Sequence, residues 1–121
     1  MDPGLQFFVP GRPVTKQRFE AGHLLPERVK AWENTIRVYA SNAMQFNPDF
    51  EKLTGSVRCE LVILLPDRRK RDIDNLSKAV LDGCNGILWD DDTQINDLRL
   101  IKRYDKDNPG VHIRVWEAEE G

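Results

Sequence analysis

The segment from Val57 to Leu65 constrains the fold most strongly. Apolar residues occupy every second position in it, and from Leu61 onward every residue is apolar. Because successive side chains of a strand face opposite sides of a sheet, this pattern predicts a strand whose second half is buried on both faces. Pro66 cannot donate a backbone hydrogen bond to a sheet and therefore ends the strand.

Shorter patterns place other strands along the chain. Residues 5–9 are apolar and aromatic and are followed by a Pro-Gly pair, which predicts a first strand. Residues 94–104 alternate in polarity and predict a strand, and the apolar residues at alternate positions of 111–115 predict the last one. The turn-forming residues of 105–110 separate these two strands.

Helical periodicity appears twice. Apolar residues recur at three- and four-residue spacing over residues 26–46 and again over about 75–84, so each segment is predicted to form a helix with one apolar face. We therefore expect residues 1–121 to form a single α/β (α+β) domain. In this domain, a small mixed sheet of about four strands packs with two helices.

The composition describes an ordinary globular protein. It is 40% hydrophobic and 31% charged with a formal net charge of −2, whereas a nonspecific DNA coat is normally basic overall. A local basic groove beside an acidic metal site is still compatible with this charge. Cys59 and Cys84 lie in apolar stretches and are expected to be free thiols in a reducing compartment. Without a signal-peptide pattern or an apolar run of about 18 residues, we expect a cytoplasmic protein with no membrane segment.

Residues 67–92 carry the candidate chemistry. Two groups of carboxylates, Asp72 with Asp74 and the run from Asp90 to Asp92, lie on either side of the second predicted helix. Grouped carboxylate oxygens suit Mg²⁺ or Mn²⁺, and the stretch contains no histidine that would favour zinc. In extended backbone, Asp72 and Asp74 would face one site, on which Asp92 could converge. The residues alone equally allow an aspartate that caps the helix and a solvated turn at 90–92.

Cations accompany these carboxylates. Four of them stand directly before Asp72 and form either a solvated loop or a grip on a phosphate backbone: Arg68, Arg69, Lys70 and Arg71. Lys78 would either form an ion pair of about 0.3–0.5 kcal/mol with Asp74 or face the metal site and contact phosphate. The long loop before the first helix carries Lys16 and Arg18 and is either a solvated loop or a flap that contacts phosphate.

The polar positions together resemble the RusA family of Holliday junction resolvases. The resemblance rests on Asp-Ile-Asp-Asn-Leu-x-Lys-Ala-Val-x-Asp from Asp72 to Asp82, followed by Asn85-Gly86, Trp89, Asp91-Asp92 and Gln94-Ile95. Looser agreement extends to Pro10-Gly11-Arg12-Pro13-Val14-x-Lys16-x-Arg18 and to Trp32-Glu33.

This resemblance implies a RusA-like fold and a homodimeric endodeoxyribonuclease. It would bind four-way DNA junctions and nick two strands symmetrically with Mg²⁺, or with Mn²⁺ as a substitute, in DNA recombination and repair. By position it implies catalytic roles for Asp72, Asp74, Asp92 and Lys78, with Asp91 sharing the metal. A DNA-backbone role falls to Lys16, Arg18 and Arg68 to Arg71. Two alternatives are a non-catalytic junction-binding protein of the same fold and a metal-dependent phosphohydrolase acting on nucleotides.

Overall fold

A computed structural model describes residues 4–17 and 25–119. Its elements are β1 (Leu5–Pro10), α1 (Glu27–Phe46), β2 (Val57–Leu65), α2 (Ile73–Cys84), a 3-10 turn η1 (Asp92–Gln94), β3 (Ile95–Tyr104) and β4 (Gly110–Glu117). The strands form one sheet in the order β1-β4-β2-β3. None of the helices described is long and apolar enough to cross a membrane.

Strand β2 lies inside the sheet, as its apolar pattern predicts. It pairs in parallel with β3 and antiparallel with β4, and β4 pairs antiparallel with β1. The parallel pair requires a crossover connection, which α2 supplies between β2 and β3. The sheet is therefore mixed, and the predicted fold of four strands with two helices is confirmed.

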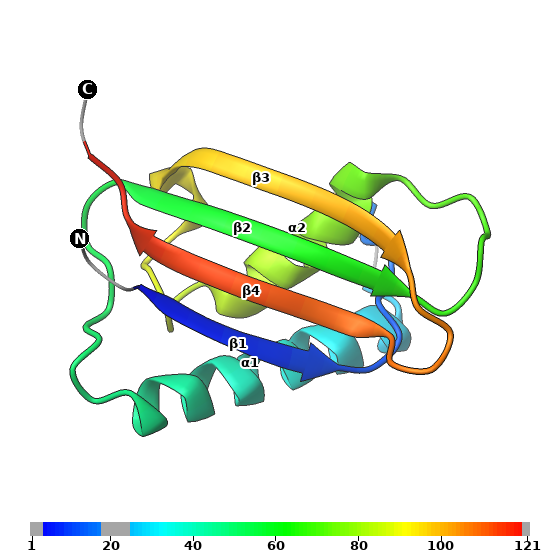
Figure 1. Ribbon diagram of the computed structural model, residues 1–121, viewed down its shortest axis with the longest axis horizontal. Coiled ribbons are helices and arrows are strands. Elements are labelled where there is room, and N and C mark those ends of the chain that lie inside the picture. The colour runs from blue at the N-terminus through cyan, green and yellow to red at the C-terminus, as the bar shows by residue number, and fades with distance from the viewer. Residues whose placement is uncertain (1–3, 18–24, 120–121) are drawn as a thin grey trace.

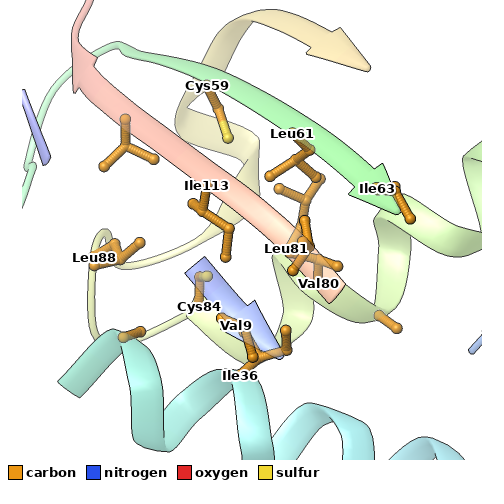
Figure 2. Packing of buried hydrophobic residues seen from close by; sticks show 14 of the residues in the cluster. Val9, Ile36, Cys59, Leu61, Ile63, Val80, Leu81, Cys84, Leu88 and Ile113 are labelled. Carbon is orange, nitrogen blue, oxygen red and sulfur yellow. The ribbon is translucent and has the colours of Figure 1, made fainter. Parts of the chain in front are cut away.

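Both helices lie on one face of the sheet, where the hydrophobic core forms (Figure 1). Side chains at alternate positions of β2 point toward them, and Leu61 and Ile63 pack with Ile36 of α1 and Val80 of α2 (Figure 2). The two cysteines are buried free thiols in this core, and burial raises the pKa of Cys59 to about 12.

The close approach of the helices depends on Gly83. A Cβ atom at this position would lie 2.7 Å from Cβ of Ile36, which is closer than two carbon atoms can pack. Gly83 lies inside the last turn of α2, where its lack of a side chain lets α1 pack against α2.

The other face of the sheet, which we call the open sheet face, has no helix over it (Figure 1). Val62 and Leu64 of β2 point to this side and are only half-buried. The prediction that the second half of β2 is buried on both faces is therefore wrong for the single chain. The reason is that both helices pack on the same side of the sheet, which the alternation in sequence does not specify.

Candidate active site

Asp72 and Asp74 lie at the N-terminal end of α2. Asp72 is the N-cap residue in extended backbone, whereas Asp74 belongs to the first helical turn, so the two residues do not form the extended pair that the sequence predicted. The helix begins two residues earlier than predicted because Ile73 and Asp74 already adopt helical geometry. The side chain of Asp72 makes no capping hydrogen bond, and within the described residues neither carboxylate has an ion-pair or hydrogen-bond partner. Both are exposed and placed where the helix dipole favours negative charge.

Asp90 and Asp91 have structural partners. Asp90 forms an ion pair with Lys52 at 2.6 Å. Asp91 is the N-cap of η1 and accepts a hydrogen bond from the backbone N–H of Thr93. Hydrogen bonding to the side chain of Thr93, and then to its backbone N–H, lowers the pKa of the Asp91 carboxyl group. The side chain of Gln94 accepts hydrogen bonds from the backbone N–H groups of Asp90 and Asp91. Residues 90–92 are thus an ordered, capped turn.

Asp92 lies in a negative environment. Burial raises the pKa of its carboxyl group, the charges of Asp91 and Asp82 raise it further, and Lys78 opposes them. A carboxylate that is held among other carboxylates gains most from a bound cation, which would relieve the repulsion. Asp92 is therefore the member of the 90–92 group best suited to bind a metal ion.

The two carboxylate groups flank different parts of α2. Asp92 is near Lys78 and Asp82, whereas Asp72 and Asp74 stand at the start of the helix. At a rise of 1.5 Å per residue, Asp74 and Asp82 are about 12 Å apart along the axis. Among the residues that the structure describes, no group of three His, Cys, Asp or Glu side chains is arranged to hold one ion. The convergence of Asp92 with Asp72 and Asp74 on one metal ion therefore stays a prediction.

Lys78 pairs with Asp82, one turn further along α2, and not with Asp74. Its Nζ atom lies 3.4 Å from Oδ2 of Asp82. Lys16 contacts the same Oδ2 atom at 2.7 Å and also contacts Glu33 of α1 at 2.6 Å. Sequence reasoning assigned no role to Asp82 or Glu33, although Asp82 stands four residues after Lys78 and both occur in the family pattern.

The basic run is divided by its contacts. Arg71 is mostly buried and pairs with Asp67 at 2.8 Å, so its charge is balanced inside the loop. The guanidinium of Arg68 stacks on the ring of Tyr104, and Arg69 and Lys70 are exposed. Three cations thus remain outward on the loop that leads into Asp72. The prediction for Arg18 lies outside the described residues.

Comparison with known proteins identifies the family of the chain. The family model described as "Endodeoxyribonuclease RusA" matches residues 10–116. The chain belongs to the RusA family. A protein of Aquifex aeolicus (strain VF5), named crossover junction endodeoxyribonuclease RusA, is 32% identical over 92 residues, which are 74% of this chain and 69% of that protein.

Two other RusA relatives match over shorter segments. The crossover junction endodeoxyribonuclease RusA of Escherichia coli (strain K12) is 43% identical over 51 residues, which are 41% of this chain and 42% of the relative. The protein of the same name from Enterobacteria phage 82 is 31% identical over 81 residues, which are 66% of this chain and 63% of the relative. The matched segments of these two therefore span less than two thirds of the relatives' own length.

Proposed function

We propose that this protein is a metal-dependent endodeoxyribonuclease that resolves four-way DNA junctions by paired, symmetric nicks. The observation that carries the proposal is the pair Asp72 and Asp74, which are exposed and have no described partner, directly after the outward cations of residues 68–70. Cations attract a DNA backbone and carboxylates bind the metal that hydrolysis of phosphodiesters commonly uses. Membership of the RusA family, with relatives named crossover junction endodeoxyribonucleases, supplies the substrate class.

Mg²⁺ is the proposed metal, with Mn²⁺ as a substitute. The donor set fits, because Mg²⁺ takes oxygen ligands and is usually bound by one or two carboxylates together with waters and substrate phosphates. Asp72 and Asp74 would provide protein ligands at one end of α2, and Asp92 with Asp91 would provide them beside its other half. When bound, the ion would supply an activated water and stabilise negative charge on phosphate oxygens.

The remaining roles follow from exposure. Arg68, Arg69 and Lys70 would hold the DNA backbone, since they point outward from the loop. The side chain of Lys78 is 44% exposed, and its Nζ atom lies 3.4 Å from Asp82, which is long for an ion pair. Its ammonium group is therefore loosely held and can contact the scissile phosphate. Lys16 and Arg71, which were also predicted to hold DNA, have their charges balanced by carboxylates of the protein.

A homodimer would present two equal sites to a junction, and the open sheet face offers a surface for the second copy. One row of side chains crosses all four strands and is largely apolar: Phe8, His112, Val62 and Ile101. A hollow of about 330 Å³ lies on this face, lined in part by Phe8, Val62 and His112. A second copy packed here would complete the burial of β2 that its apolar sequence predicts.

Charge and size also favour a second copy on this face. The neighbouring row contains Arg114, Glu60 and Arg99, and both arginines pair with Glu60 at 3.7 Å. Because both signs of charge occur together, the face is complementary to itself across a two-fold axis. Four strands about 4.8 Å apart and about eight residues long cover roughly 500 Å² of flat sheet. Because protruding side chains add surface to the flat sheet, the area approaches the roughly 800 Å² per partner of a standard interface.

A non-catalytic junction-binding protein is the second candidate, because the described residues contain no ready-made group of three side chains able to hold a metal ion. One assay separates the candidates. The protein is incubated with Mg²⁺ or Mn²⁺ and a labelled four-way junction, a linear duplex of the same sequence, or a nucleoside triphosphate. We expect paired nicks at symmetric positions of the junction only. Binding without incision under both metals would favour the second candidate, and equal cutting of the duplex would contradict junction selectivity.

A further inference from the structure

Lys16 ties the N-terminal loop to both helices. Its backbone N–H donates a hydrogen bond to the carbonyl oxygen of Asn75 at 2.8 Å. Its Nζ atom lies between Glu33 of α1 and Asp82 of α2, and the side chains of these three residues are only 12–19% exposed. Burial lowers the pKa of Lys16, but the hydrogen bonds to Asp82 and Glu33 outweigh it and raise the pKa above its ordinary value. Lys16 is therefore a fixed positive charge inside the protein.

Asp82 is shared unequally between two lysines. Its Oδ2 atom is 2.7 Å from Nζ of Lys16 and 3.4 Å from Nζ of Lys78. A charge-assisted hydrogen bond is strongest at about 2.7–2.9 Å, so Lys16 satisfies most of the charge of Asp82. Lys78 is held only weakly, and its side chain is 44% exposed.

We propose that Lys16 is a positioning residue that neutralises Asp82 and thereby keeps the ammonium group of Lys78 available to the substrate. This proposal rests on the proposed nuclease function and deepens it. Among the described residues, Lys16 and Lys78 are the ion-pair partners of Asp82. Without Lys16, the mostly buried carboxylate of Asp82 pairs with Lys78 alone, and the two draw together along the helix. Lys78 then loses its contact with phosphate although Lys78 itself is not mutated.

The contact with Glu33 supports a positioning role. Glu33 would keep Lys16 charged and in place if Asp82 were removed, since its Oε2 atom lies 2.6 Å from Nζ of Lys16. The substitution Asp82→Asn therefore removes the carboxylate that competes for Lys78 without leaving Lys16 unpaired. If the pair of Lys16 and Asp82 were of purely structural importance, Asp82→Asn would reduce cleavage as much as Lys16→Met does.

The test compares three variants: Lys16→Met, Asp82→Asn, and the double variant that carries both substitutions. Lys30→Met is the control. Lys30 is an exposed lysine of α1 that pairs only at 3.6 Å with Glu27. Junction affinity, single-turnover cleavage with Mg²⁺ and thermal melting are measured for each. Lys78 is also labelled with limiting acetic anhydride, and its acetylation is read by peptide mass spectrometry, because this readout does not require cleavage.

We expect Lys16→Met to slow cleavage about tenfold and acetylation of Lys78 about threefold, with junction affinity within twofold of the parent. Adding Asp82→Asn should restore both rates. A double variant as slow as Lys16→Met, or a loss of junction affinity with a shallower salt dependence, overturns the proposal. If Lys16→Met does not fold, Asp82→Asn alone tests the proposal. Lys78 should then be acetylated faster than in the parent protein, and an unchanged acetylation rate overturns the proposal. A parent protein that cuts nothing contradicts the nuclease function, while the labelling result still tests the link between Lys16 and Lys78.

Discussion

The ammonium group of Lys78 lies 3.4 Å from the carboxylate of Asp82, and Asp74, four residues before Lys78, is left without a described partner. The charge of α2 is therefore balanced in its second half and unbalanced at its start. Asp72 and Asp74 retain their negative charge at the helix N-terminus, where the dipole stabilises it. Under the proposed function these two unpaired carboxylates would bind the metal ion, which leads to the first prediction.

Asp72→Asn is expected to reduce junction cleavage by at least about 100-fold, because an amide is a weak ligand and metal ions contribute several kcal/mol to charge stabilisation. Junction affinity should be unchanged or higher, since one negative charge near DNA is lost. Cleavage with Mg²⁺ is followed on a labelled junction, and affinity is measured by gel shift with Ca²⁺. Asp49→Asn, at an exposed loop position, is the control, and wild-type cleavage by Asp72→Asn would refute the metal assignment.

Val62→Arg is expected to dissociate the proposed dimer. A charged side chain in the apolar row of the open sheet face is tolerated by a monomer that exposes this face, but is buried in a dimer at a cost of about 3 kcal/mol, or roughly 100-fold in affinity. Sedimentation equilibrium measures the change. Val38→Arg, on α1 at a position 55% exposed, is the matched control. If both variants associate like the parent protein, the second copy does not bind at the open sheet face.

Asp92→Asn is expected to raise the melting temperature at neutral pH while reducing cleavage. Burial and the charges of Asp91 and Asp82 raise the pKa of Asp92, so its ionised form costs stability in the folded state. This cost is fully present above the folded pKa and disappears as pH falls below the unfolded pKa. The gain from Asp92→Asn should therefore be largest at neutral pH and vanish below about pH 3.5, the region of the ordinary aspartate pKa. Scanning calorimetry across this range checks it, and equal gains at both ends would contradict the assigned cause.

Gly83→Ala is expected to destabilise the protein by up to about 2 kcal/mol. The new Cβ atom would meet Cβ and Cγ2 of Ile36 at 2.7 Å, and neither atom can move away without shifting a helix. Overpacking costs about 1–3 kcal/mol and outweighs the roughly 1 kcal/mol that alanine contributes through helix propensity. Gly55→Ala is the control, because nothing lies within 4 Å of its added Cβ atom. Urea denaturation compares the two, and equal midpoints would show that the helices adjust freely.

The sequence predicted the elements well because each carries a strong local pattern. The alternation in Val57–Leu65 defines an interior strand, and the helical spacing before Phe46 defines α1. It did not predict which face of β2 the helices cover, because alternation is the same on both sides of a strand. The start of α2 was placed late because Ile73 and Asp74 are poor indicators of a helix, and only the backbone shows that it begins there.

The candidate site was predicted in composition but not in geometry. Residue types identified Asp72, Asp74 and Asp92 as candidate ligands, yet spacing along the chain could not show that Asp92 lies beside Asp82. Lys16 was expected to contact DNA because it stands in a cationic loop. Its contacts with Glu33 and Asp82 join segments 17 and 66 residues away, which no local pattern records.

Gln94 makes the surface turn at residues 53–55 unusually intolerant of changes in length. Its amide oxygen accepts hydrogen bonds from the backbone N–H groups of Asp90 and Asp91, and its amide nitrogen donates to the carbonyl oxygens of Leu53 and Gly55, both at 3.0 Å. Surface turns normally accept insertions. An insertion between residues 53 and 55 would instead break hydrogen bonds that hold Gln94 of η1 in place, and it would thereby displace Asp92 of the same turn. In natural variation among such chains, we expect the length of this turn to be kept while its exposed side chains change.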